Sequence, residues 1–116
     1  MKNLNGEIEY KNKKYKLVFN LNVMEQIQDE YKTLDEWGKL SDGSEGEPNV
    51  KAIIFGFTTM LNEGIDIDNE ENGTDIKPFT LKQVGRMITE LGLTQSSNIL
   101  NKTVIESTKS DNPEKN

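Results

Sequence analysis

The chain has 116 residues, with 14 Lys and Arg against 20 Asp and Glu, a formal net charge of -6, and neither cysteine nor histidine. The lack of both residues excludes disulfides and thiolate sites, and removes the commonest general base and metal ligand, so we expect a non-enzymatic protein with no metal and no cofactor. The negative charge disfavours nucleic acid and anionic membranes as partners, and without an apolar leader or membrane-spanning run we expect a cytoplasmic protein.

Alternating side chains near the N-terminus predict a β-hairpin over residues 6–19, in which apolar residues take one face and charged residues the other. Pairing Tyr10 with Tyr15 would leave Asn12 and Lys13 in a two-residue turn. Two strands alone are marginally stable, so we expect helices to cover their apolar face.

Apolar residues at helical spacing predict four helices behind the hairpin, covering about residues 21–32, 50–63, 81–91 and 95–106. A polar residue that can cap the first turn stands before each of them: Asn20, Asn49, Thr80 and Thr94. Gly64 is expected to end the second of these helices and Gly92 the third. The apolar stripes of the second and third helices are expected to include Val50 and Leu81, respectively.

A shorter helical turn is predicted between the first two of these helices. Thr33 and Glu36 have the spacing of a capping box, and the turn that they open carries Trp37 and Leu40. Residues 41–48 are rich in glycine, serine and acidic side chains, and their composition predicts a flexible loop.

Residues 63–75 contain six acidic residues and no basic residue, which predicts a mobile, solvated loop. Asp68 and Gly73 match the first half of a calcium-binding EF-hand loop. Phe79, however, stands where such a loop requires a bidentate glutamate. The pattern therefore favours a solvated loop over a calcium site.

A helix-turn-helix is the main alternative interpretation, with residues 84–104 as two helices around a turn at Gly92. Such a motif would make the chain a small DNA-binding regulator. Against it, bulky Ile88 occupies the inward position where the motif usually has alanine, and the second helix of the motif offers one cation, Lys102. The net charge also opposes DNA binding.

Together these patterns predict an α+β fold, in which an N-terminal two-stranded hairpin packs on a small bundle of about four helices. Residues 1–107 are expected to form a single domain, followed by a polar, flexible tail over residues 108–116.

This order of elements resembles the tail assembly chaperones of long-tailed, siphovirus-like bacteriophages or prophages. The likeness lies in residues 7–19 as the opening hairpin, 20–31 as the first helix, 51–64 as the central helix and 80–91 as the capped helix. Together these segments cover most of the chain. The resemblance is one of layout and implies no catalytic motif.

The resemblance implies that the protein binds the long, apolar, helical tape measure protein in the host cytoplasm and recruits tail tube subunits around it. It also implies that the protein is absent from the mature virion, and it allows self-association. Trp37, Leu40 and Phe55 are apolar and lie off the clearest core stripes, so they are the candidate residues for the contact surface.

Overall fold

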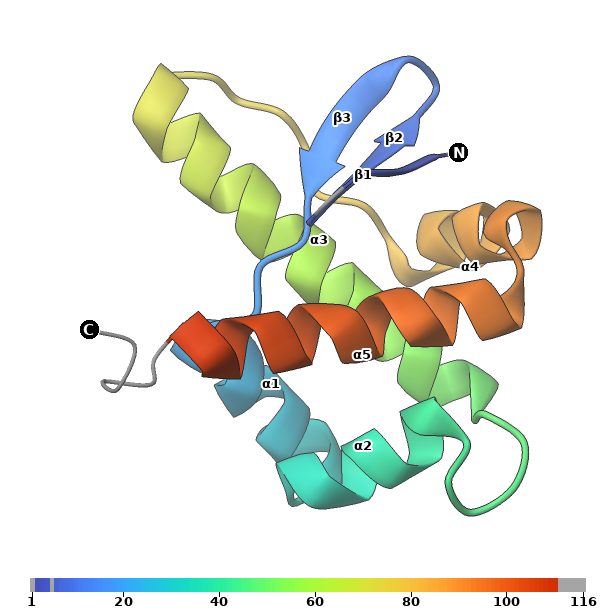
Figure 1. Cartoon of the computed structure of the whole chain (residues 1–116). Coiled ribbons are helices and arrows are strands. Elements are labelled where there is room, and N and C mark those ends of the chain that lie inside the picture. The colour runs from blue at the N-terminus through green and yellow to red at the C-terminus, as the bar shows by residue number, and fades with distance from the viewer. Residues whose placement is uncertain (1, 5, 111–116) are drawn as a thin grey trace.

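The computed structural model describes residues 2–4 and 6–110 (Figure 1). Within them, the chain forms three strands and five helices: β1 (Lys2–Leu4), β2 (Glu7–Tyr10), β3 (Lys13–Lys16), α1 (Leu21–Tyr31), α2 (Leu34–Asp42), α3 (Val50–Asn72), α4 (Leu81–Leu91) and α5 (Leu93–Ser110). The predicted α+β fold, a hairpin packed on helices, is confirmed. The predicted tail is wrong where α5 continues to Ser110, and residues 111–116 lie outside the described residues.

The hairpin of β2 and β3 forms with a register two residues away from the predicted one. Tyr10 lies opposite Lys13, so its predicted pairing with Tyr15 is wrong. Lys11 and Asn12 form the turn with φ values of 51° and 65°. Two-residue hairpin turns of type I′ require positive φ at both positions, and asparagine tolerates it well. A shift of two residues keeps each side chain on its predicted face.

A third strand, β1, pairs antiparallel with β2 and gives the sheet order β1-β2-β3. The segment after β3 is joined to α3 by a hydrogen bond from the Val18 N–H to the Met60 carbonyl, 3.3 Å long. The Lys16 ammonium lies 3.1 Å from the Asp68 carboxylate farther along α3. The hairpin is therefore anchored on the C-terminal half of α3.

The first two helices begin at the predicted caps. The Asn20 Oδ1 accepts a hydrogen bond from the Val23 N–H at 3.2 Å, and the Thr33 hydroxyl accepts one from the Glu36 N–H at 3.0 Å. The second of these opens α2, a helix of nine residues rather than a single turn. Leu21, which begins α1, is 78% exposed.

The central helix α3 begins at the predicted cap, where the Asn49 Oδ1 accepts from the Ala52 N–H at 2.9 Å. The prediction that Gly64 ends it is wrong, because α3 continues to Asn72 and ends at Gly73. The mobile loop predicted for residues 63–75 is therefore mostly helix. Gly64 is buried, and a Cβ atom there would collide with the Lys16 carbonyl oxygen, so this glycine permits close packing of α3 on the hairpin.

Two asparagines of α3 hold the segment that connects α3 to α4. The Asn69 side chain accepts from the Ile76 N–H and donates to the Ile76 carbonyl, both at 3.0 Å. The Asn62 side chain likewise accepts from the Phe79 N–H at 2.8 Å and donates to the Phe79 carbonyl at 2.9 Å. These pairs lay the connection back along α3 and fix where α4 begins.

The last two helices meet at one residue. The predicted capping box of Thr80 and Gln83 opens α4, and Gly92 ends it as predicted. Gly92 has a φ of 103°, so the chain turns sharply and α5 begins at the next residue. The predicted cap at Thr94 is therefore wrong, and the Ser96 N–H instead donates to the Gly92 carbonyl at 3.0 Å.

The core surrounds α3, which runs diagonally through the molecule in Figure 1 with α5 crossing it. The buried cluster includes Ile8 of the hairpin and side chains from every helix, with Phe57 of α3 completely buried. Trp37 of α2 joins this core, and its Nε1–H donates to the Ala52 carbonyl at 2.9 Å. None of the helices among the described residues combines the length and hydropathy needed to cross a bilayer.

Candidate functional site

An apolar groove of about 960 Å³ lies between the N-terminal half of α3 and the length of α4. One face of each helix forms a wall, and Glu30 of α1 also contributes to the lining. The residues that line the groove are Glu30, Val50, Lys51, Ile54, Phe55, Leu81, Lys82, Gly85, Arg86 and Thr89.

The lining follows from helical spacing. On α4, Lys82, Gly85, Arg86 and Thr89 follow the i, i+3, i+4, i+7 pattern that places residues on one face of a helix. Gly85 has no side chain, and a Cβ atom there would lie 3.7 Å from the Ile54 Cδ1. Gly85 therefore lets the α4 wall come close to Ile54 on the α3 wall.

Two aliphatic side chains at the groove, one on each wall, are more than half exposed. Val50 is 52% exposed and Leu81 is 54% exposed. Each was expected on the core stripe of its helix, and that expectation is wrong for both. Each is the first residue of its helix, where the helix has not yet reached the packed core. The groove therefore presents apolar surface that the fold itself leaves uncovered.

Phe55 lines the groove and is supported from behind by Tyr31 of α1. The two rings meet edge to face, with centroids 5.7 Å apart and an interplanar angle of 68°. The Tyr31 hydroxyl is buried and has no hydrogen-bond partner within the described part of the chain. Burial is the main reason that the pKa of Tyr31 is raised above its usual value near 10, and Glu30 adds to the rise. The contact fixes the position of the Phe55 ring.

The rim of the groove is positively charged, although the chain as a whole carries -6. Lys51 stands on the α3 wall, and its ammonium lies 3.5 Å from the Glu30 carboxylate. Lys82 and Arg86 stand one turn apart on the α4 wall, both exposed, and neither has an ion-pair partner among residues 6–108. The groove thus combines an apolar floor with cations on both sides.

The structure separates the three residues that the sequence suggested as a contact surface. Trp37 is 3% exposed and belongs to the core, so it offers no free surface. Leu40 is 38% exposed but does not line the groove. Phe55 does line it. Sequence reasoning missed Lys82 and Arg86, for which the signal was a pair of cations at i, i+4 in an acidic chain.

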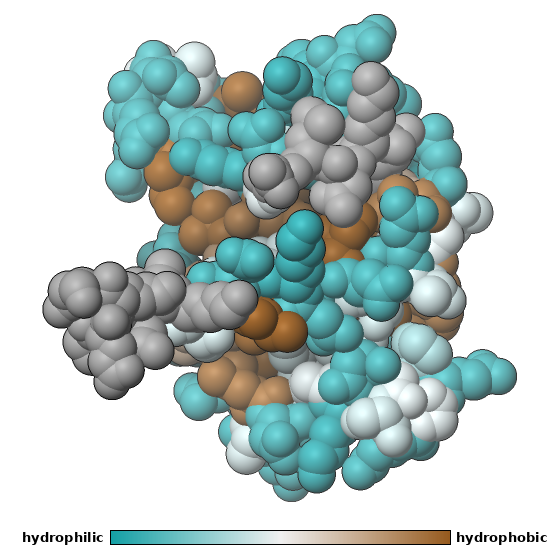
Figure 2. All heavy atoms as spheres, viewed as in Figure 1, coloured by the Kyte–Doolittle hydropathy of each residue, from teal (hydrophilic) through white to brown (hydrophobic). Residues whose placement is uncertain are grey.

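Two other hollows lie beside the hairpin and beside α5. Arg86 also borders a cleft beside the hairpin, lined by Tyr10, Lys11, Lys13, Tyr15, Phe79 and Gln83. On the face shown in Figure 2, apolar atoms reach the surface along α5 and below it, beside a hollow that α5 shares with α1 and α2. Trp37 and Phe19, both buried, form part of its wall.

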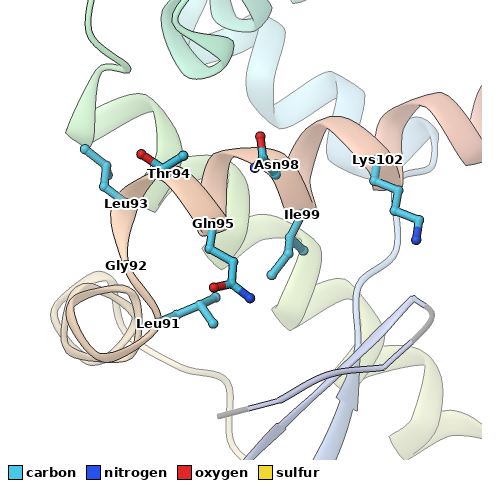
Figure 3. A pocket seen from close by; sticks show the side chains of 8 residues that line it. All are labelled: Leu91, Gly92, Leu93, Thr94, Gln95, Asn98, Ile99 and Lys102. Atoms are coloured by element: carbon cyan, nitrogen blue, oxygen red, sulfur yellow. The ribbon is translucent and has the colours of Figure 1, made fainter.

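The corner between α4 and α5 is where a helix-turn-helix would bind DNA. Figure 3 shows Leu91, Gln95 and Ile99 on one side of this corner, with Gly92 alone joining the two helices. A helix-turn-helix normally has a turn of three or four residues. In addition, Ser97 of α5 is buried and its hydroxyl donates to the Ser41 carbonyl of α2. This geometry disfavours the DNA-binding interpretation.

The acidic residues after Leu61 do not adopt the conformation of a calcium-binding loop. Asp68 lies within α3 and pairs with Lys16. Within the part of the chain that the structure describes, no three acidic side chains come together in a way that could hold a metal ion. The partial EF-hand match is therefore explained by a solvated helix face.

Comparisons of the chain with protein-family models, curated proteins and solved structures find no match. The functional conclusion therefore depends on the groove between α3 and α4 and on the layout of the elements.

Proposed function

We propose that this chain is a non-enzymatic binding protein that holds an apolar helical segment of another protein in the groove between α3 and α4. The observation that carries the proposal is the exposed apolar surface of Val50 and Leu81 beside Phe55 in one groove. A groove walled by two helices suits a third helix, which inserts an apolar stripe with residues at i, i+3, i+4 and i+7.

The energetics fit reversible binding. Burying a fully exposed aliphatic side chain is worth about 1.5–3 kcal/mol. Val50 and Leu81 are about half exposed, so covering each contributes about half of that, and a partner helix would bury apolar groups of its own. Association costs several kcal/mol in lost rotational and translational freedom. The surplus corresponds to modest affinity, which suits a protein that shields an apolar helix and later releases it.

The layout of the chain directs the proposal toward phage tail assembly. In this role the protein is a tail assembly chaperone that acts in the host cytoplasm, keeps the tape measure protein soluble and brings tail tube subunits to it. The apolar segment in the groove then belongs to the tape measure protein. The chaperone leaves before the virion matures.

Co-expression tests this proposal. The chain is expressed with the tape measure and tail tube proteins of its own genome, and the soluble, co-purifying tape measure protein is quantified. We expect solubilisation by the native chain and its loss with the double variant Val50→Gln/Leu81→Gln, which makes the groove polar without touching the core.

The matched control is Leu21→Gln/Ile76→Gln, because these two apolar residues are 78% and 43% exposed and do not line the groove. The control variant should solubilise the tape measure protein as well as the native chain does. Tape measure protein that stays insoluble with the native chain, or that is rescued equally by both double variants, would contradict the proposed role of the groove.

A further inference from the structure

The cations on the groove rim stand on both walls, and this placement suggests a specific charge pattern in the partner. Lys82 and Arg86 are four residues apart on α4, which places them about 6 Å apart along the groove at 1.5 Å per residue. Lys51 stands on the opposite wall. A helix lying between the walls would have positive charge along each flank.

We propose that the groove selects an amphipathic helix whose apolar stripe is flanked by acidic residues, with two acids at i, i+4 along the flank that faces α4. This inference rests on the proposed function and adds the class of partner segment that the groove accepts. Charge complementarity supports it, because Lys82 and Arg86 have no ion-pair partner within residues 6–108.

The pair of Lys51 and Glu30 does not oppose this arrangement. Both side chains are substantially exposed, at 75% and 43%, and their charged atoms are 3.5 Å apart. Exposed ion pairs of this kind contribute little to stability. Lys51 can therefore exchange Glu30 for an acidic residue of the partner.

The local and the overall charge of the protein predict opposite preferences. The net charge of -6 would favour a basic peptide, whereas the rim favours an acidic one. Charges are screened over about 10 Å at 0.1 M ionic strength, so residues beside the groove outweigh distant ones. Measuring the preference therefore distinguishes a built site from general electrostatic attraction.

The length of the groove determines how long a test peptide must be. The α4 wall runs from Leu81 to Thr89, about 12 Å at 1.5 Å per residue, which is slightly more than two helical turns. A synthetic helix of about 18 residues spans it with room at both ends. Two such peptides share one leucine stripe and differ only in having Glu or Lys at the flanking positions, two residues with nearly equal helix propensity.

Fluorescence anisotropy with the full chain then measures the binding of each peptide at low and high salt. We expect the Glu-flanked peptide to bind about tenfold more tightly near 0.05 M NaCl, and the difference to shrink near 0.5 M as screening increases. The variant Lys82→Glu/Arg86→Glu should reverse the preference. Lys77→Glu/Lys102→Glu, with the same change in net charge at two exposed residues outside the groove, should leave it unchanged.

Equal binding of the two peptides, or a preference that survives Lys82→Glu/Arg86→Glu, would overturn the inference. If the chain still solubilised the tape measure protein in that case, the proposed function would stand and only its charge selectivity would be lost. Analytical sedimentation of the chain alone tests whether a second copy of the chain occupies the groove instead. Dimerisation that disappears in Val50→Gln/Leu81→Gln would assign the groove to a second copy of this chain, and would also overturn the inference.

Discussion

The indole of Trp37 packs directly on the backbone of Gly56, so that a Cβ atom on Gly56 would collide with the indole ring. The Trp37 Nε1–H also donates to the Ala52 carbonyl, one turn earlier on α3, at 2.9 Å. Both contacts exist because α3 lacks a side chain at Gly56. The largest aromatic residue of the chain thus joins α2 to α3 and is unavailable to a partner.

Replacing Gly56 with alanine should destabilise the protein, although alanine is the better helix former. Overpacking of a filled core costs about 1–3 kcal/mol, which exceeds the gain of about 1 kcal/mol from helix propensity. Urea denaturation should show a lower midpoint for Gly56→Ala. Gly38→Ala on α2 is the control, because a Cβ atom there has no neighbour within 4 Å and should stabilise. Stabilisation by both variants would contradict the packing of Trp37.

The beginnings of most helices could be predicted from the sequence because capping is local. Asn20, Thr33, Asn49 and Thr80 each cap a helix with their own side chain, as their spacing to the following residues indicates. Thr94 is the exception, because Gly92 allows α5 to begin without a side-chain cap.

The predicted end of α3 is wrong because of a contact between residues that lie far apart in the sequence. Gly64 reads as a helix stop, but its missing side chain accommodates the Lys16 carbonyl of the hairpin. Ile65 is also buried, at the next position of α3. The contact with Lys16 leaves no signal in the local sequence, so Gly64 reads there as the end of the helix.

The candidate site was only partly predictable for a similar reason. Phe55 lies off the core stripe in the sequence, and in the structure it lines the groove. Val50 and Leu81 follow helical spacing and so were expected in the core. Whether the first residue of a helix is covered depends on what packs beside it, and spacing does not contain that information.

Tyr31→Phe should stabilise the protein by about 1 kcal/mol, because it removes a buried hydroxyl that has no hydrogen-bond partner among the described residues. The ring and its edge-to-face contact with Phe55 would remain. Thermal and urea unfolding at pH 7 measure the change. A loss of stability would indicate that the hydroxyl has a partner in solution.

Alkaline stability should depend on the two tyrosines whose pKa is raised, and Tyr15 and Tyr31 both owe the rise first to burial. In the unfolded chain each ionises near pH 10, before the folded form does. The stability that these two neutral tyrosines contribute is therefore complete below pH 10. It is lost as the pH rises through the pKa that each tyrosine has in the folded protein. Tyr15→Phe/Tyr31→Phe should flatten the fall in stability above pH 10, as measured by urea unfolding at a series of pH values.

Asn62 should control the N-terminus of α4 through its two hydrogen bonds to Phe79. Asn62→Leu leaves the Phe79 N–H and carbonyl without that partner and should cost about 1–3 kcal/mol. Asn62→Asp keeps the acceptor for the N–H and should cost less. Amide hydrogen exchange gives the direct readout. An unchanged exchange rate at Phe79 in Asn62→Leu would show that the connection is held in another way.

A larger side chain at position 85 should raise the stability of the protein and weaken its binding to a peptide. Its φ is not in the left-handed region, and an added Cβ atom would make an ordinary contact with Ile54. Gly85→Ala and Gly85→Leu should therefore raise the unfolding free energy by up to about 1 kcal/mol, as expected for replacing glycine inside a helix. The leucine side chain would also occupy part of the groove, which Gly85 lines.

We accordingly expect Gly85→Leu to be more stable than the native chain. It should nevertheless bind the Glu-flanked peptide at least about tenfold more weakly, which corresponds to a loss of about 1.4 kcal/mol or more in binding free energy. Gly38→Ala, a stabilising change outside the groove, should bind normally. Binding defects usually accompany unfolding, so a defect in a stabilised variant locates the site in the groove. Native affinity in Gly85→Leu would place the peptide elsewhere on the protein.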